Sequence, residues 1–417
     1  MTGARIRTSY RIGYIALVVP FVLSFFTRFA PGSLAEPIVD ELHFSATELA
    51  LATGTYFYVY TLMQLPAGAL IDRVGIRWAV GAGTVVSAGG LLLYSVAQSI
   101  VVAIAASAII GLGSSTTFLG ILRAVGFWFT GTAFALMSGV TMLVGNIGSV
   151  AAGGPLTSLL TVMSWRELLA ITAGVSLAAA AAVLVLRGHV PGRAQEAASG
   201  DRTPLTEMIC DRRLIGYALI AVGTNSTFYT FSSLWGTPYL GTLGIPIGVA
   251  ATIVSVSLLV YGLVSLAIGL LSDRMGGNGT IMVTVSVAGV VGWVLITIAT
   301  VTPGGPVIAV VGLFLSAIAA GSVVVVFSLV NDYLGDRGGA SALAVVNGAV
   351  FLFVAVLQQI VAAVLDVGGR STVSYTTAMA TLTAIAAIGL VAAVISRSTT
   401  AATGESAADT AVSATRL

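Results

Sequence analysis

Two arginines stand inside long apolar stretches of this sequence, where a charged side chain is costly to place. Arg28 follows a run rich in Val, Leu and Phe, and an arginine deep in such a stretch costs roughly 2.5–3.5 kcal/mol unless it faces water or a partner. Glu36 and Asp40 are the acidic candidates for that partner. Because a guanidinium suits carboxylate binding, we interpret Arg28 as a cation that faces a cavity. The alternative is an arginine that extends to the polar surface.

Arg123 is the second of these arginines, and it lies near the end of its apolar stretch, before Trp128 and Phe129. From that position a long side chain reaches the polar surface easily. The alternative is a second contact to a bound ligand or to an inner gate. We therefore include Arg123 among the candidate binding residues.

Tyrosines and amides recur at helical spacing in other apolar stretches. Tyr56, Tyr60 and Gln64 are spaced four residues apart, so they share one face of a helix. Asn225 and Tyr229 share a face in the same way. Because buried amides need partners, these residues either bond neighbouring helices or line a cavity. The candidate binding set, with Arg28 and Arg123, is Tyr56, Tyr60, Gln64, Asn225, Tyr229, Asn347 and Gln358.

Other kinds of chemistry have no suitable residues. Cys210 is the single cysteine, and the two histidines, His43 and His189, lie far apart in the sequence, so we expect no metal site. No nucleophile and base form a catalytic pattern, which argues against an enzyme, and we expect no cofactor. No basic run with interleaved aromatic residues occurs, so nucleic acid is not an expected partner.

The composition places these residues in a membrane. The chain has 417 residues, of which 57% are hydrophobic and only 8% charged, and its mean hydropathy is +1.03. A soluble protein cannot bury so much apolar surface, and at about 20 residues a span the length allows about twelve transmembrane helices. The predicted spans are 11–34, 47–71, 77–97, 100–127, 133–160, 166–187, 213–235, 248–271, 280–300, 305–330, 339–364 and 372–396. The first span also has some features of a cleaved signal peptide.

The arginines predict the orientation of these spans. All 18 basic residues are arginines. With the N-terminus inside, fourteen of them lie on the cytoplasmic side and only Arg166 and Arg370 on the other, apart from the two within spans. This bias follows the positive-inside rule, and an even number of spans returns the C-terminus to the cytoplasm. We therefore expect a multi-pass protein of the cytoplasmic membrane with both termini cytoplasmic.

The two halves of the chain repeat each other at an offset of 201 residues. Gly68, Asp72, Arg73 and Gly75 correspond to Gly269, Asp273, Arg274 and Gly276, and Tyr60, Asn146 and Arg28 correspond to Tyr261, Asn347 and Tyr229. A six-span unit repeated in one orientation predicts two halves related by an axis along the membrane normal. The predicted parts are an N-terminal six-helix bundle (1–187), a cytoplasmic linker (188–212), a C-terminal six-helix bundle (213–397) and a disordered cytoplasmic tail (398–417).

The repeated block carries a family resemblance. The segment Gly68-Ala-Leu-Ile-Asp72-Arg73-Val-Gly75-Ile-Arg77 resembles the loop 2–3 motif of the major facilitator superfamily, and the copy at Asp273 and Arg274 is degenerate. Further segments resemble a branch with proteobacterial intraphagosomal amino-acid transporters and lysosomal facilitator-type dipeptide transporters. These segments are Arg28-Phe-Ala-Pro-Gly32, Tyr56-Phe-Tyr-Val-Tyr60 with Gln64-Leu-Pro66, Trp165-Arg166, Trp235-Gly-Thr-Pro238-Tyr239-Leu240, and Asn347 with Gln358.

The resemblance implies the major facilitator fold and alternating access between the halves. In such proteins the motif residues, here Asp72, Arg73, Gly75 and Arg77, form a cytoplasmic charge lock that is made in one access state and broken in the other. The span-four arginine before a Gly-x-Gly is missing, since Ser107 stands there, and the antiporter motif of span five is only approximate. Both departures weaken an inference of proton antiport.

The leading hypothesis is a secondary transporter for a small carboxylate-bearing solute, such as an amino acid, short peptide or organic acid. All 16 carboxylates lie in loops, tails or span ends, which favours a uniporter, an anion exchanger or coupling through a peripheral group such as Glu48. The alternatives are a multidrug or metabolite efflux pump and a receptor built on the same scaffold. The expected partners are a small-molecule substrate and the lipid bilayer, with the protein working as a monomer.

Overall fold

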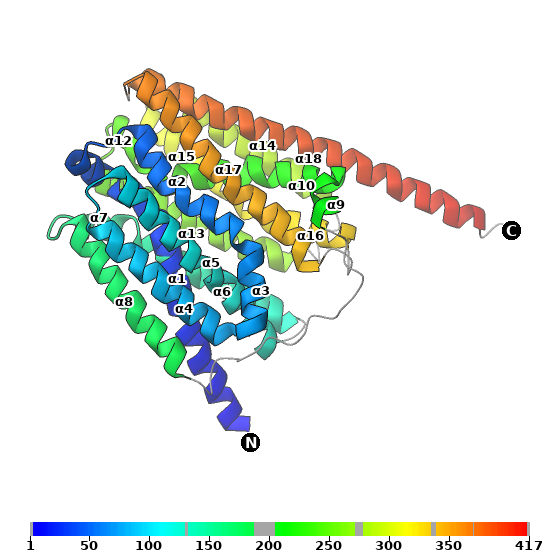
Figure 1. Cartoon of the computed structure of the whole chain (residues 1–417). Helices are drawn as coiled ribbons and strands as arrows, with labels where there is room; N and C mark the ends of the chain where they lie inside the picture. Colours follow the sequence, from blue (N-terminus) through cyan, green and yellow to red (C-terminus); the bar gives the residue numbers. More distant parts are fainter. Residues whose placement is uncertain are drawn as a thin grey trace.

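The computed structural model is a bundle of long helices (Figure 1). It describes residues 3–129, 132–186, 205–271, 278–334, 339–369 and 371–414, and these contain no strand. The first half contains α1 (Gly3–Leu42), α2 (Ala46–Leu62), α3 (Gln64–Val74), α4 (Ile76–Ser95), α5 (Ile100–Trp128), α6 (Thr132–Ala151), α7 (Gly154–Leu159) and α8 (Trp165–Val185). After α9 (Leu205–Cys210), the second half contains α10 (Arg212–Ala221), η1 (Val222–Ser226), α11 (Thr227–Thr230), η2 (Phe231–Trp235), α12 (Gly236–Thr242), α13 (Ile247–Leu271), α14 (Asn278–Ile298), α15 (Gly305–Gly321), α16 (Val323–Leu334), α17 (Gly339–Val367) and α18 (Thr372–Ala414).

These helices follow the predicted spans and confirm an all-α integral membrane fold. Ten helical stretches within the described residues are long and apolar enough to cross a membrane. The other two predicted spans correspond to α2 with α3 and to the path from α10 to α12, which are broken into shorter pieces. Spans five and ten are also built from two helices each, α6 with α7 and α15 with α16.

The second span breaks because of a proline. Pro66 has no backbone N–H, and its ring crowds the carbonyl of Leu62, which is the last residue of α2. Met63 therefore lies between the two helices, as the C-cap of α2 and the N-cap of α3. At the other end of α3, Gly75 has φ 88° and ψ 158°, a conformation open to glycine and costly for other residues. The turn leads directly from α3 into α4, and its positive φ explains why the second glycine of the motif stands at this position.

The seventh span contains two π-helical turns. The wider turns η1 and η2 flank the single α-helical turn α11, and all the residues from Val222 to Trp235 are buried. Single π-turns inside α-helices are rare and frequently occur at functional sites. They shift the register of the side chains, and so the helical spacing of Asn225 and Tyr229 in the sequence does not by itself set their directions.

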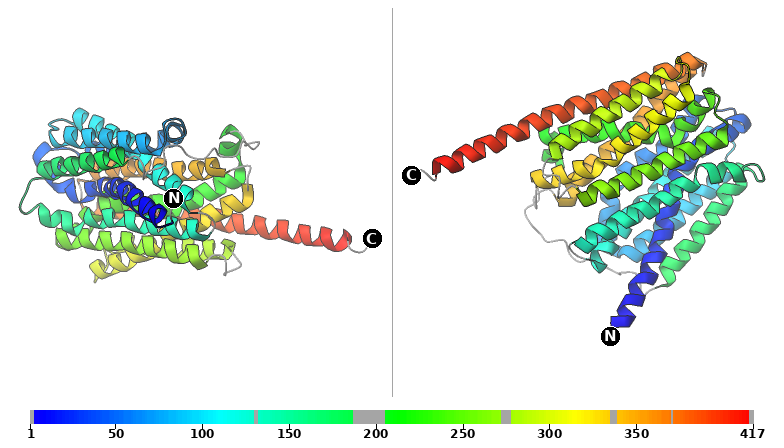
Figure 2. Two further views of the ribbon diagram at one scale, coloured as in Figure 1. Left: turned by 90° about the horizontal axis from the view of Figure 1, so that it is seen from below. Right: turned by 180° about the vertical axis from the view of Figure 1, so that it is seen from behind.

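Both ends of the chain project from the same end of the bundle, as Figures 1 and 2 show. This end also carries α3 and α9, and we call it the motif end; the opposite end, where α1 gives way to α2, is the far end. A chain whose ends share one side crosses the bundle an even number of times. The predicted cytoplasmic position of both termini stays a prediction, since it depends on the arginine distribution.

Three predicted segments lie partly outside the described residues. Of the linker 188–212, α9 and the start of α10 are described. The second motif copy, with Asp273 and Arg274, lies outside the described residues. In the segment predicted as a disordered tail, α18 continues as a helix as far as Ala414 and projects from the bundle (Figure 1). The many alanines of this segment favour helix.

Candidate functional site

Arg28 lies inside the protein, two-thirds of the way along α1. Its side chain is buried, with a relative exposure of 5%. Nη2 donates a long hydrogen bond of 3.5 Å to the hydroxyl of Tyr56, and Nε has no hydrogen-bond partner among the residues that the structure describes. Arg28 therefore does not extend to the surface, which was the alternative open from the sequence.

No carboxylate neutralises this cation within the part of the chain that the structure describes. The ion pairs found there are Asp72 with Arg123 and Glu41 with Arg166. Glu36 and Asp40, the partners considered from the sequence, are exposed near the end of α1 and form no ion pair with Arg28. A buried charge without a counter-ion is costly, and such residues in membrane proteins mark binding or transport pathways.

Aromatic rings surround the guanidinium in place of a counter-ion. The Cζ of Arg28 lies 4.7 Å from the ring centre of Phe351, 4.8 Å from Tyr60, 5.1 Å from Phe25 and 5.9 Å from Tyr56. Each contact falls within the range of a cation–π interaction, which is worth about 0.5–2 kcal/mol. The rings partly stabilise the charge, but only the Tyr56 hydroxyl accepts a hydrogen bond from the guanidinium. The unpartnered Nε therefore stays available to a ligand.

Arg28 borders a cavity that both halves of the chain enclose, which we call the central cavity. From the first half α1, α2, α5 and α6 contribute, and from the second half η1, α11, α13, α16 and α17. The charged and amide side chains in its described lining are Arg28, Asn225 and Asn347. Its aromatic lining consists of Phe25, Tyr60, Phe118, Tyr229, Tyr261, Phe327 and Phe351. A cavity at the interface of two repeats is where secondary transporters bind their substrates.

Residues related by the repeat meet in this cavity. Arg28 and its counterpart Tyr229 both line it, and so do Tyr60 and its counterpart Tyr261. The rings of Tyr229 and Phe351 stack at 5.9 Å, and Phe351 also packs edge-on against Tyr60 at 5.1 Å. Arg28 and Tyr229, which were expected to point to a common axis, therefore face one cavity.

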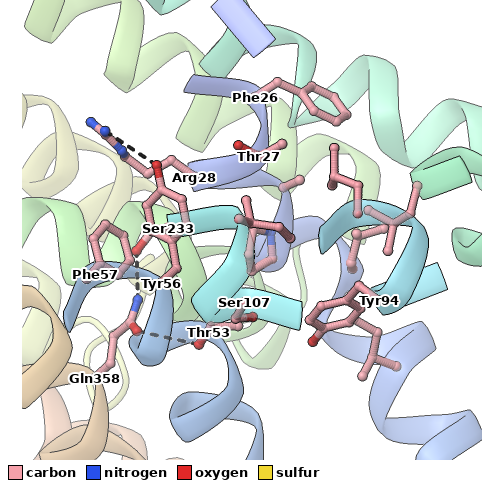
Figure 3. A pocket seen from close by; sticks show the side chains of 17 residues that line it. Phe26, Thr27, Arg28, Thr53, Tyr56, Phe57, Tyr94, Ser107, Ser233 and Gln358 are labelled. Atoms are coloured by element: carbon pink, nitrogen blue, oxygen red, sulfur yellow. Dashed lines mark hydrogen bonds between the residues drawn. The ribbon is translucent and has the colours of Figure 1, made fainter. Parts of the chain in front are cut away.

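A second cavity extends from Arg28 toward the far end, mostly within the first half (Figure 3). In this view Arg28 bonds to Tyr56, and Gln358 links two neighbouring helices. Nε2 of Gln358 donates to Ser233 Oγ at 3.0 Å, and its Oε1 accepts from Thr53 at 3.5 Å. We call this the side cavity. Gln358 and Ser233 are the described residues of the second half that line it.

The other predicted amides take different positions. Asn225 lines the central cavity and donates through Nδ2 to the carbonyl of Ala320 at 2.7 Å. Asn347 lines the same cavity, whereas its repeat counterpart Asn146 bonds to the Met142 carbonyl of its own helix. Gln64 is buried at the start of α3 and lines neither cavity, and its Nε2 has no partner in the described part of the chain.

Arg123 lies at the motif end and not beside Arg28. It forms an ion pair with Asp72 and donates to the carbonyl of Gly68 at 3.3 Å, so it fastens α3 to α5. Neither cavity that Arg28 borders includes Arg123. Arg123 thus lies apart from both cavities, and its predicted contact to a substrate or to an inner gate stays a prediction.

The remaining motif residues also lie at the motif end. Arg77 donates to the carbonyl of Leu184 at 3.3 Å and lies 5.0 Å from the ring centre of Trp78, so it joins α4 to α8. Arg73, in the last turn of α3, is exposed. The ion pair of Asp72 with Arg123 therefore belongs to a set of contacts that connect the helices of the first half at the motif end.

At the far end, a carboxylate from the second half caps a helix of the first half. Asp366, near the end of α17, accepts hydrogen bonds from the N–H groups of Ala46 at 2.8 Å and Thr47 at 2.7 Å. Ser45 caps the next N–H, that of Glu48, whose carboxylate in turn accepts from Ser45. Glu48, considered above as a coupling group, thus completes a capping box.

Asp366→Ala is expected to loosen the far end. Charge-assisted hydrogen bonds are worth about 1.5–3 kcal/mol, so losing this cap shifts an open–closed equilibrium by about tenfold or more. A reporter cysteine at Ile38, which lines the side cavity on α1, would then react about tenfold faster with an impermeant thiol reagent. The protein background for this labelling is Cys210→Ser, because Cys210 is exposed.

The matched control for this experiment is Asp40→Ala, which removes another exposed carboxylate at the same end. Asp40→Ala is expected to leave the labelling rate unchanged. Equal rates for Asp366→Ala and the unaltered background would show that the cap does not hold the halves together.

Several lining residues were not among the sequence candidates. Tyr261 could have been found, because it is the repeat counterpart of Tyr60. Phe351 lies one helical turn from Asn347 and Phe25 one turn from Arg28, so each shares a face with a candidate. The role of Asp366 could not be predicted from the sequence, because carboxylates are common at the ends of transmembrane helices.

The architecture is similar to that of solved structures whose names describe transporters. A point mutant of the nucleoside transporter NupG superimposes with a TM-score of 0.76 at 16% identity, covering 92% of this chain and 99% of that one. An inward-facing bacterial homologue of the human lysosomal transporter Spinster superimposes with a TM-score of 0.71 at 14% identity, covering 93% and 96%. The two comparisons show that the chain shares the fold of these proteins.

Sequence comparison then identifies the family. Residues 17–363 match the profile of the Major Facilitator Superfamily, and the chain belongs to this family. The resemblance and the fold predicted from the loop 2–3 motif are thereby confirmed at the level of the superfamily. The finer branch, with amino-acid and dipeptide transporters, stays a prediction.

Curated relatives match parts of the chain. The transporter YybO of Bacillus subtilis (strain 168) is 32% identical over 146 residues, which are 35% of this chain and 33% of that protein. A protein of Agrobacterium vitis named as a tartrate transporter is 22% identical over 260 residues, 55% of this chain and 59% of its own length. A Cupriavidus necator protein named as the sulfoacetate transporter SauU is 21% identical over 146 residues, 35% and 34%. In each case the chain spans less than two thirds of the relative.

Proposed function

We propose that this secondary transporter moves a small carboxylate-bearing solute, and that the carboxylate binds Arg28. The observation that carries the proposal is the buried guanidinium of Arg28, which has an unpartnered Nε and no carboxylate partner among the described residues. Arg28 presents a planar fork of donors that matches a carboxylate in two parallel bonds. Binding such an anion would replace the missing counter-ion.

The relatives support an acidic solute. Two of the proteins that match this chain are named for the transport of tartrate and sulfoacetate, which are both organic acids with two acidic groups, so they support an anionic solute but not a particular number of charges. Within the described residues, no Asp or Glu lines the central or the side cavity. An efflux pump for cationic drugs is the second candidate; the aromatic lining suits an apolar drug, but the buried arginine disfavours a cation.

The movement would be alternating access around the central cavity. Both halves contribute to this cavity, and α2 and α17 join them at the far end through Asp366 and Gln358. With the termini on the cytoplasmic side, the far end is the outer gate. The halves would then release each other at that end when the cavity opens outward.

Uptake by proteoliposomes tests this function. The purified protein is expected to give saturable uptake of at least one member of a panel of organic acids, amino acids and dipeptides. Empty liposomes are the control, and each solute is measured with and without a proton gradient. Because no carboxylate lines the cavities in the described part of the chain, we expect flux without a proton gradient. Saturable uptake of cationic drugs alone would contradict the proposal.

A further inference from the structure

The charge of the central cavity sets a limit on its ligand. Arg28 lines both the central cavity and the side cavity. Among the described residues that line either cavity, no other side chain is charged. Arg123 is paired with Asp72 at the motif end. Apart from the ligand, the site therefore carries one positive charge and, in the described residues, no negative one.

We infer that the solute is a monovalent organic anion with an apolar body. This inference rests on the proposed function, in which Arg28 binds the carboxylate. A dianion would bring a second charge into a site with one cation, and a buried unpaired charge is strongly unfavourable. In this respect the solute of this chain would differ from tartrate and sulfoacetate, which each carry two acidic groups and for which two of the relatives are named. A zwitterion would bring an ammonium group for which the described lining offers no carboxylate.

The aromatic lining of the central cavity indicates that the solute has an apolar body. Phe351 lies at the centre of the aromatic lining, since it contacts Arg28 at 4.7 Å, Tyr60 at 5.1 Å and Tyr229 at 5.9 Å. Flat, apolar groups of a ligand pack well against such rings. A carboxylate on Arg28 would place the rest of the solute against Phe351 and its neighbours, with the amides of Asn225 and Asn347 within the same lining.

A set of matched ligands tests this inference by binding to the purified protein. The reference is 3-phenylpropanoate. Phenylalanine adds an ammonium group to the same skeleton, benzylmalonate adds a second carboxylate, 3-phenylpropanamide replaces the carboxylate by a neutral amide, and propionate lacks the ring. At neutral pH, 3-phenylpropanoate is expected to bind about tenfold or more tightly than each of the other four.

The outcomes separate this inference from the proposed function. Suppose that phenylalanine or benzylmalonate binds as tightly as 3-phenylpropanoate, and that this affinity depends on Arg28. The inference of a monovalent anion would then be overturned, whereas the proposal that Arg28 binds a carboxylate would stand. Propionate binding equally well would overturn the apolar body. Equal binding of 3-phenylpropanamide would remove the carboxylate role itself. Absence of binding by every member would also overturn the inference, while the wider uptake panel still tests transport.

Phe351→Leu tests the assignment of the apolar wall. This change keeps an apolar side chain on α17 but removes the ring. It is therefore expected to lower the affinity for 3-phenylpropanoate about tenfold and to leave the affinity for propionate unchanged. Phe231→Leu is the control, because Phe231 is a buried ring that packs on Tyr239 and Trp293 and lines neither cavity. A loss of affinity that is equal for both ligands, or equal for both variants, would overturn the role of Phe351.

Discussion

Arg28→Gln is expected to weaken binding of the carboxylate solute by at least about 30-fold, because removing one partner of a buried charge pair costs about 2–5 kcal/mol. The same change is expected to leave the thermal stability of the protein unchanged or higher. The reason is that the ligand-free protein holds a buried guanidinium with one long hydrogen bond and no carboxylate partner among the described residues. Calorimetric titration and a melting curve in detergent measure the two quantities.

Two further variants make the Arg28 result specific. Arg28→Lys keeps the charge but loses the planar fork, so its affinity is expected to fall between those of the wild type and Arg28→Gln. Arg11→Gln, on the same helix and exposed, is expected to bind as the wild type does. Wild-type affinity of Arg28→Gln would exclude the carboxylate role. A large loss of stability would show that Arg28 supports the fold instead.

Asp72→Asn is expected to slow transport about fivefold while the protein still reaches the membrane in normal amount. Asp72 pairs with Arg123 across α3 and α5, and the pair is partly exposed, with side-chain exposures of 57% and 33%. Solvent screens such a pair, so its contribution is about 1 kcal/mol, which corresponds to about fivefold in a rate or an equilibrium. The initial rate of uptake, divided by the amount of protein, is the measurement.

A double-mutant cycle tests whether the two residues act together. Arg123→Gln is expected to resemble Asp72→Asn, and the double variant should be no slower than the slower single variant. Arg73→Gln is the control, because Arg73 is an exposed neighbour in the last turn of α3. Strictly multiplicative losses, or a similar loss in Arg73→Gln, would mean that the ion pair is not the functional element.

Much of the fold could be predicted because the membrane restricts it. Few charges and long apolar runs set the spans, and the repeat of Asp72 and Asp273 indicated two equivalent halves. Pro66 was visible in the sequence, but whether it kinks or breaks its span depends on how the neighbouring helices pack. The two π-turns around Tyr229 also depend on tertiary packing, so no local pattern predicts them.

The site could be predicted only where a residue type was unusual for its surroundings. Arg28 stood out because a cation in an apolar stretch is costly, and the repeat connected it to Tyr229. Phe351 did not, because a phenylalanine in a transmembrane helix has many possible roles. The ion pair of Asp72 with Arg123 required a choice of partner among several arginines, which the spacing along the sequence cannot make.

Transport of a carboxylate solute by wild-type and Arg28→Gln protein in matched proteoliposomes tests the role of Arg28 most directly. The solute is the best member of the uptake panel, and both proteins are reconstituted at equal density. We predict saturable uptake by the wild type and uptake indistinguishable from empty liposomes by Arg28→Gln at the same solute concentration. Equal uptake by both proteins would contradict the claim that Arg28 binds the carboxylate of the transported solute.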